Sequence, residues 1–248
     1  MNSISNKATL GENVEVGEFT VVKDDVKIGD NVVIGNNVII HAGTEIGNNI
    51  RIDDNTVIGK QPMRSVNSIF KDDEKQPSAV IGDGAIIGTG VIIYAGSKVG
   101  KEVLMADLAT IREESTVGDK TIVGRNATIE NVCTVGSNCK IQTNAYITAY
   151  SEVGDNVFIA PGVVTTNDNF AGRSEKRFKY HKGVIVKNGG RIAANATTMS
   201  GITINEDSLV AAGSIVTKNT PAKKIVMGSP AKEYKDVPED QLLENQKS

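Results

Sequence analysis

Apolar residues recur at every sixth position along almost the whole chain. Three series, at 10–58, 81–165 and 186–216, contain 30 such positions, of which 28 are apolar. Four positions after most of them stands a small or β-branched residue, such as Cys133 or Cys139. Because side chains alternate between the two faces of a strand, each unit of six predicts a short strand with two inward side chains, followed by a turn. Both cysteines are therefore predicted to be small core residues.

Taken cyclically in threes, the units define three corners that differ in composition. At the first corner the residue after the apolar position is glycine in eight turns of ten, which predicts tight turns with positive φ. At the second corner this residue is mostly small. At the third corner it is Lys23, His41, Gly59, Tyr94, Arg112, Glu130, Thr148, Thr166, Met199 and Thr217. Both breaks in the repeat, at 59–80 and 166–183, also open there, so the third corner is the predicted edge of a functional site.

The composition supports an all-β chain and excludes several functional classes. The 248 residues include 27 Ile and 28 Val but only 6 Leu, with 25 Gly and 22 Asn for turns. Because β-branched residues are disfavoured in helices, a helix bundle, a coiled coil and a doubly wound nucleotide-binding fold are excluded. A net charge of −3 offers no basic field for nucleic acid, and no apolar run is long enough to cross a membrane. With two cysteines and no secretory signal we expect a cytoplasmic protein, and its Cys and His residues are too scattered for a metal site.

Five segments of the C-terminal half follow one another as they do in a known family. They are VFIAPGVVTTND (157–168), NFAGRSEKRFKYHKG (169–183), RIAANATTMSGITI (191–204), LVAAGSIVTKNTP (209–221) and IVMGSPAK (225–232). On these segments and the six-residue repeat, the chain resembles the hexapeptide-repeat acyltransferases from about residue 10 to 220. Within that family it is similar to the N-acetyltransferases that act on nucleotide-linked amino-deoxy sugars.

The resemblance implies an all-β fold, a left-handed parallel β-helix of about ten coils in residues 1–220. Two loop insertions, 59–80 and 166–183, interrupt it, and a tail at 221–248 is extended and then helical from about Pro238. The resemblance also implies a homotrimer that binds acetyl-CoA between adjacent prisms and acetylates the amine of a nucleotide-linked sugar. A dTDP-linked 3-amino-3,6-dideoxyhexose is the favoured acceptor, and no metal, nucleic acid or membrane partner is expected.

Small residues and lysines of the last coils are predicted to bind acetyl-CoA. The residues are Ala160, Ala193, Ala194, Ala211, Ala212, Gly213, Lys218 and Lys224. Small side chains leave main-chain groups within reach of the pantetheine arm, and the lysines supply charges for its phosphates. The alternative is that the alanines pack one prism against another and that the lysines are solvated.

The predicted catalytic groups are Glu130, Asn144 and His181. We expect Glu130, at the third corner, to orient the sugar amine or accept its proton, while Asn144 helps to position the acceptor. His181, in the second insertion, is the alternative base. Because an amino-sugar amine is only weakly basic, the CoA sulfur is an adequate final proton acceptor and a strong enzymic base is not required.

The predicted substrate ligands come from both insertions and from the corner between them. They are Arg64, Phe70, Arg112, Asn167, Asp168, Arg173 and Lys182. The basic side chains suit a diphosphate, the aromatic ring suits a nucleobase, and Asn167 and Asp168 suit sugar hydroxyls. Two alternatives stay open, a tetrahydrodipicolinate N-acyltransferase and a non-catalytic structural β-helix.

Overall fold

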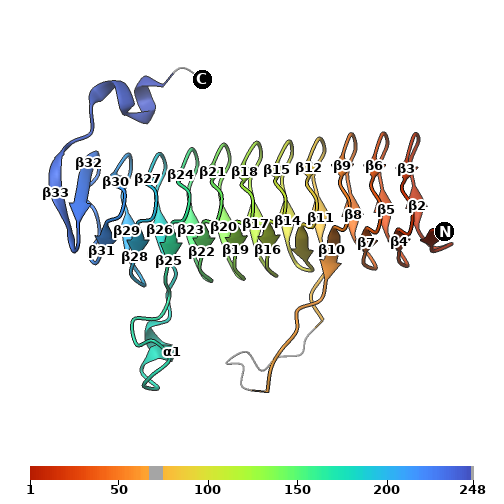
Figure 1. Ribbon diagram of the computed structural model, residues 1–248, viewed down its shortest axis with the longest axis horizontal. Helices are drawn as coiled ribbons and strands as arrows, with labels where there is room; N and C mark the ends of the chain where they lie inside the picture. The colour runs from red at the N-terminus through yellow and green to blue at the C-terminus, as the bar shows by residue number, and fades with distance from the viewer. Residues whose placement is uncertain (67–74, 247–248) are drawn as a thin grey trace.

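The computed structural model, which describes residues 1–66 and 75–246, is a long three-sided prism of short parallel strands (Figure 1). Each side is one sheet, and a strand pairs with the strand three places later in the chain, 18 residues on wherever no insertion intervenes. The predicted parallel β-helix is confirmed. The two ends of the chain lie at opposite ends of the prism, and both insertions leave it along the same edge.

Three sheets make up the prism. Sheet A consists of β1 (Ser3–Ile4), β4 (Val21–Val22), β7 (Ile39–Ile40), β10 (Val57–Lys60), β13 (Ile92–Tyr94), β16 (Thr110–Ile111), β19 (Thr128–Ile129), β22 (Tyr146–Ile147), β25 (Val164–Thr165), β28 (Thr197–Thr198) and β31 (Ile215–Val216). Sheet B consists of β2 (Thr9–Leu10), β5 (Lys27–Ile28), β8 (Glu45–Ile46), β11 (Val80–Ile81), β14 (Lys98–Val99), β17 (Thr116–Val117), β20 (Thr134–Val135), β23 (Glu152–Val153), β26 (Ile185–Val186) and β29 (Thr203–Ile204). Sheet C consists of β3 (Glu15–Val16), β6 (Val33–Ile34), β9 (Arg51–Ile52), β12 (Ile86–Ile87), β15 (Leu104–Met105), β18 (Ile122–Val123), β21 (Lys140–Ile141), β24 (Phe158–Ile159), β27 (Arg191–Ile192), β30 (Leu209–Val210), β32 (Lys224–Gly228) and β33 (Ala231–Asp236).

The apolar residue of each six-residue unit points into the prism. From β4 to β31 the second residue of almost every two-residue strand is buried, while the first is exposed or half-buried. Cys133 and Cys139 are buried among these side chains, which confirms their predicted place in the core. Burial raises the pKa of the Cys133 thiol to about 12, so this thiol stays protonated and unreactive at neutral pH.

The coil count and the tail differ in detail from the prediction. In the described residues, sheets A, B and C hold 11, 10 and 12 strands, because β1 precedes the first predicted unit, β32 adds a parallel strand beside β30, and β33 pairs antiparallel with β32. The expected helix after Pro238 consists of two 3₁₀ turns, η1 (Glu239–Gln241) and η2 (Leu243–Asn245). A single α-helical turn, α1 (Arg177–Tyr180), lies in the second insertion.

The glycines of the first corner serve a purpose other than the predicted one. The positive φ values fall two residues later, at positions such as Asn13 (φ 56°) and Asn138 (φ 57°), and Gly11 and Gly136 are not among them. A Cβ on Gly136 would instead lie 2.6 Å from the backbone of Gly154 in the next coil. The expectation of positive φ at these glycines was wrong. Glycine is required because successive coils touch there backbone to backbone.

Each corner is named here by the sheets that it joins. The first is the B–C corner, the second the C–A corner and the third the A–B corner. At the first two, Asp and Asn side chains accept a backbone N–H bond from the preceding coil: the Oδ1 atoms of Asp30, Asn48, Asp119, Asp155 and Asn188 at the B–C corner, and of Asn36, Asp54 and Asp107 at the C–A corner. These ladders tie coil to coil where no sheet bonds exist.

Candidate active site

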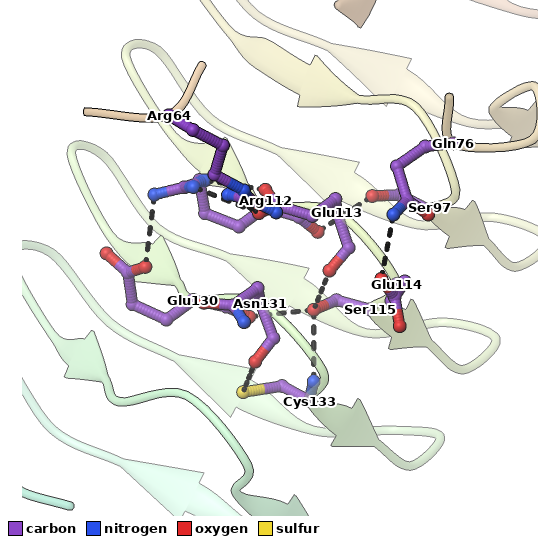
Figure 2. Close-up of polar contacts among 10 residues, drawn as sticks. All are labelled: Arg64, Gln76, Ser97, Arg112, Glu113, Glu114, Ser115, Glu130, Asn131 and Cys133. Atoms are coloured by element: carbon purple, nitrogen blue, oxygen red, sulfur yellow. Dashed lines mark hydrogen bonds and ion pairs between the residues drawn. The ribbon is translucent and has the colours of Figure 1, made fainter. Parts of the chain in front are cut away.

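A chain of four charged side chains runs along the A–B corner (Figure 2). Arg64 Nη1 lies 2.8 Å from Glu113 Oε1, and Arg112 holds the same carboxylate through Nε at 2.8 Å and Nη2 at 3.1 Å. Arg112 Nη1 then lies 3.3 Å from Glu130 Oε2. Three predicted site residues, Arg64, Arg112 and Glu130, are thus brought together by one glutamate that the sequence analysis did not single out.

The repeat explains most of this arrangement. Arg112 and Glu130 follow β16 and β19, which are neighbours in sheet A, so they occupy the same place in successive coils. Arg64 comes from the first insertion, whose described ends are joined by reciprocal hydrogen bonds between Gln61 and Gln76. Gln76 also donates to the Glu114 side chain at 2.9 Å, so the insertion contacts the prism at two adjacent residues.

The shared carboxylate is buried and ionised. The Glu113 side chain is 1% exposed, against 16% for Arg64 and 24% for Arg112. Burial raises the pKa of Glu113, but the hydrogen bonds from Arg112 and Arg64 outweigh this effect and hold the pKa below that of an ordinary glutamate. The Arg112 guanidinium also lies 4.9 Å from the centre of the Tyr94 ring, a cation–π contact that supports its orientation.

Glu130 is half-buried and lies close to the Tyr146 side chain. Burial raises the pKa of Tyr146, and the charge of Glu130 and a hydrogen bond with it raise that pKa further. The carboxylate of Glu130 therefore lies between the Arg112 guanidinium and the Tyr146 side chain.

The second insertion supplies another polar group beside the same corner. Asp168 accepts backbone N–H bonds from Phe170 at 2.8 Å and Gly172 at 3.0 Å, which lower the pKa of this carboxyl. His181 packs edge-on against Tyr150 with ring centres 5.5 Å apart. Burial lowers the pKa of His181, and the positive charge of Arg177 lowers it further, while Asp168 opposes both effects. The imidazole is therefore neutral at pH 7, the form that a base requires.

Within one subunit, Asn144 does not lie beside Glu130. It has positive φ (59°) and stands at the C–A corner, where its Oδ1 accepts a bond from Asn126 Nδ2 at 2.9 Å. Thr148 is the next-coil equivalent of Glu130, and Asn144 precedes it by four residues, or roughly 13 Å along a strand. The two predicted catalytic residues therefore lie on opposite sides of sheet A, one before and one after its short strands.

The alanines and the glycine predicted to bind CoA lie at the C–A corner, like Asn144. Ala160 is 5% exposed, Ala193, Ala194 and Ala211 are half-buried, and Ala212 and Gly213 are exposed. The series of Asp and Asn side chains that accept backbone N–H bonds at this corner ends at Asp107. Beyond it, the backbone N–H groups of Arg125, Thr143, Ala194 and Ala212 have no acceptor within residues 1–66 and 75–246. A row of main-chain donors thus remains open along this corner.

The remaining predicted residues are placed as follows. Asn167 is half-buried, Arg173 and Lys182 are exposed, and the Asn167 carbonyl accepts the Lys182 N–H at 3.3 Å. Lys218 lines a pocket of about 320 Å³ at the C-terminal end of the prism. Lys224 pairs with Asp236 at 2.7 Å and Glu233 at 3.2 Å on β33. Phe70 lies outside the described residues.

Glu113, Tyr146 and Tyr150 were not anticipated from the sequence. The run of three charged residues at 112–114 was a visible signal at the functional corner. Burial of the middle one was not visible, because it depends on where the first insertion folds back. Among the described residues no group of three or more potential metal ligands occurs, and no helix there has the length and apolar character of a membrane span.

Two family models match the chain. "Bacterial transferase hexapeptide (six repeats)" matches residues 7–42 and 132–167, and "Hexapeptide repeat of succinyl-transferase" matches residues 25–60 and 183–218. Over 58 residues the chain is 41% identical to 2,3,4,5-tetrahydropyridine-2,6-dicarboxylate N-acetyltransferase of Staphylococcus aureus (strain JH9). That match covers 23% of this chain and 24% of the relative, so it spans about a quarter of the relative's length.

Solved structures of acyltransferases are similar to this chain. The UDP-N-acetylglucosamine acyltransferase of Bacteroides fragilis 9343 is 20% identical, with a TM-score of 0.51, over 94% of this chain and 72% of that one. The corresponding enzyme of Francisella novicida is 18% identical, with a TM-score of 0.47, over 94% and 67% of the two chains. At 20% identity, the Bacteroides fragilis likeness concerns the architecture of the prism alone.

Proposed function

We propose that this chain, which belongs to the hexapeptide-repeat acyltransferases, transfers an acetyl group from acetyl-CoA to the amine of a nucleotide-linked amino-deoxy sugar in the cytoplasm. The observation that carries the proposal is the A–B corner. There a partly exposed carboxylate, Glu130, stands beside fixed cationic and aromatic groups and next to two insertions. The second insertion, 166–183, holds five Lys and Arg residues and two acidic residues, which suits the diphosphate of a nucleotide-linked sugar.

Glu130 is proposed to orient the acceptor amine. An amine N–H donated to its carboxylate turns the nitrogen lone pair toward the thioester carbonyl. The C–N bond then forms as the C–S bond breaks, and the amine proton passes to the departing CoA sulfur. Since the lone pair of a weakly basic amine is already free at neutral pH, orientation contributes more than proton removal.

The open N–H row supports the donor half of the proposal. Pantetheine carries amide carbonyls, and unpaired main-chain donors beside alanine side chains allow it to approach and to form hydrogen bonds. Ala194 and Ala212 lie on this row beside Gly213, and Lys218 lines the pocket at the C-terminal end of the prism. We propose that acetyl-CoA lies along the C–A corner with its phosphates toward Lys218.

A homotrimer unites the two halves of the site. The first residue of every strand of sheet A is uncharged, and Lys60 lies at the far end of β10, at the A–B corner. These first residues are Ser3, Val21, Ile39, Val57, Ile92, Thr110, Thr128, Tyr146, Val164, Thr197 and Ile215. Sheets B and C each carry four charged residues at the equivalent positions: Lys27, Glu45, Lys98 and Glu152, and Glu15, Arg51, Lys140 and Arg191. We propose that sheet A faces the threefold axis, so that the A–B corner of one subunit meets the C–A corner of the next. Glu130 and Asn144 would then meet across the interface.

A second candidate follows from the relative in Staphylococcus aureus. The 41% identity over 58 residues favours a tetrahydrodipicolinate N-acetyltransferase, whose acceptor is a dicarboxylate rather than a nucleotide. We favour a dTDP-linked 3-amino-3,6-dideoxyhexose over a dicarboxylate as the acceptor, because both insertions offer basic groups at the same corner.

Thermal unfolding in the presence of CoA, dTDP, UDP or a dicarboxylate distinguishes the two candidates. A ligand at about 100 times its Kd stabilises the native state by about 2.7 kcal/mol, which raises Tm by roughly 5–10 °C. We expect CoA and dTDP each to raise Tm by that amount. A response to CoA and a dicarboxylate, with none to either nucleotide, would reject the sugar-nucleotide proposal in favour of the second candidate.

Replacing Glu130 by alanine tests its role. If Glu130 orients the amine, Glu130→Ala lowers kcat about tenfold and raises the acceptor KM less, because the lost interaction is strongest in the transition state. A fall of about 10²–10⁴-fold would instead indicate general base catalysis. The control is His181→Asn, which should keep the main inflection of the pH–rate profile. Loss of activity together with loss of an inflection at or below pH 6–7 would assign the base to His181, since burial lowers the pKa of this histidine.

A further inference from the structure

We propose that Glu113 is the positioning residue of the acceptor site. Its buried carboxylate holds Arg64 of the first insertion and Arg112 of the prism in one arrangement, and through Arg112 it determines where Glu130 lies. The inference rests on the proposed function, because it concerns how the acceptor half of that site is assembled.

The place of Glu113 in the coil is unusual for a charged residue. The equivalent position of the neighbouring coils at this corner holds Ala95, Asn131 and Ala149, all of them buried. A glutamate at a position that turns inward must find partners, since an unpaired buried charge is strongly destabilising. Glu113 finds them in two guanidinium groups, of which only Arg112 belongs to its own coil.

The contact with Arg64 is the buried, charged attachment of the described part of the first insertion. Other attachments are neutral on the insertion side: Gln76 donates to the exposed Glu114, and the Pro77 carbonyl accepts the Gly96 N–H at 2.6 Å. A hydrogen bond between two ionised groups in a site screened from water is stronger than an exposed one in which only the acceptor is ionised. Glu113 therefore decides how residues 61–66 lie against the prism.

The contact with Arg112 fixes the next residue of the chain. Arg112 uses Nε and Nη2 for Glu113, a two-point contact that defines the plane of its guanidinium, and the Tyr94 ring lies 4.9 Å from it. Its Nη1 edge is thereby directed at Glu130. Glu130 consequently meets a cation whose position is determined by Glu113.

The test compares Glu113→Gln with Glu114→Gln. In Glu113→Gln an amide replaces a carboxylate that two arginines share, and its NH₂ group opposes one of them. In Glu114→Gln the adjacent charge is removed, but an oxygen acceptor for Gln76 remains. We expect Glu113→Gln to speed hydrogen exchange of the Gln76 amide, which donates to Gln61 Oε1, about tenfold or more and to raise the acceptor KM by a similar factor, with the acetyl-CoA KM unchanged. Glu114→Gln should leave all three quantities within about twofold of the native protein.

A second variant covers the case in which Glu113→Gln does not fold. Arg64→Met removes the partly exposed partner and should reproduce the faster exchange and the acceptor KM effect. Equal exchange rates and KM values in Glu113→Gln and Glu114→Gln would overturn the proposal, as would an equal rise in the KM of both substrates. The exchange measurement needs no substrate, so a native protein that acetylates no nucleotide-linked sugar would reject the proposed function, while exchange alone would decide the role of Glu113.

Discussion

Gly136→Ala is expected to destabilise the prism by about 3 kcal/mol, the usual scale for forcing an atom into a packed interior. A Cβ at this position would lie 2.6 Å from the backbone carbon of Gly154 and 2.5 Å from Asp155 Oδ1, the atom that accepts the Ser137 N–H. The backbone of the next coil cannot retreat without breaking the sheet bonds on either side of the corner. For a chain of this length the effect corresponds to a fall in Tm of roughly 6–12 °C.

Asn138→Gly is the matched control for this prediction. It lies two residues further along the same turn, with φ 57°, a conformation that glycine adopts without strain. We expect its free energy of unfolding to change by no more than about 0.5 kcal/mol. Calorimetry or urea unfolding of both variants measures the contrast. Equal stabilities would show that the glycines of the B–C corner are not required by close stacking of the coils.

Val164→Asp is expected to dissociate the proposed trimer and abolish activity. Val164 is 41% exposed on the outward face of sheet A, where the first residue of every strand is uncharged. In the trimer this face would be covered, and burying three carboxylates near a threefold axis costs several kcal/mol for each of them. Sedimentation should then give a monomer of 26.3 kDa. Because Glu130 and the open N–H row would no longer meet, kcat/KM should fall on the order of 10²-fold or more.

Ile86→Asp, on the outward face of sheet C, is the control. Ile86 is 47% exposed, and its sheet already carries charged residues, so the variant should sediment and catalyse like the native protein. If Ile86→Asp dissociated the assembly and Val164→Asp did not, the interface would be sheet C and the arrangement of the composite site would be wrong.

The core and the sheets could be predicted from the sequence because the repeat is local. In a β-solenoid each coil contacts only the coils next to it, so an 18-residue spacing in the chain becomes adjacency in space. Arg112 and Glu130 are neighbours for this reason. The same repeat places Asn144 at the C–A corner and Glu130 at the A–B corner, although the two residues lie at similar heights along the prism.

What the sequence determined by itself is everything that repeats with the six-residue unit: the inward residues, the three sheets, the buried cysteines and the corner from which both insertions leave. What only the tertiary structure decided is everything that breaks the unit. The first insertion has no six-residue repeat, so its sequence did not reveal that Arg64 contacts the buried carboxylate of Glu113. The sequence showed that the B–C corner requires glycine but suggested the wrong reason. A positive φ and a close backbone contact both demand glycine, and only the structure shows that the close contact is the reason here.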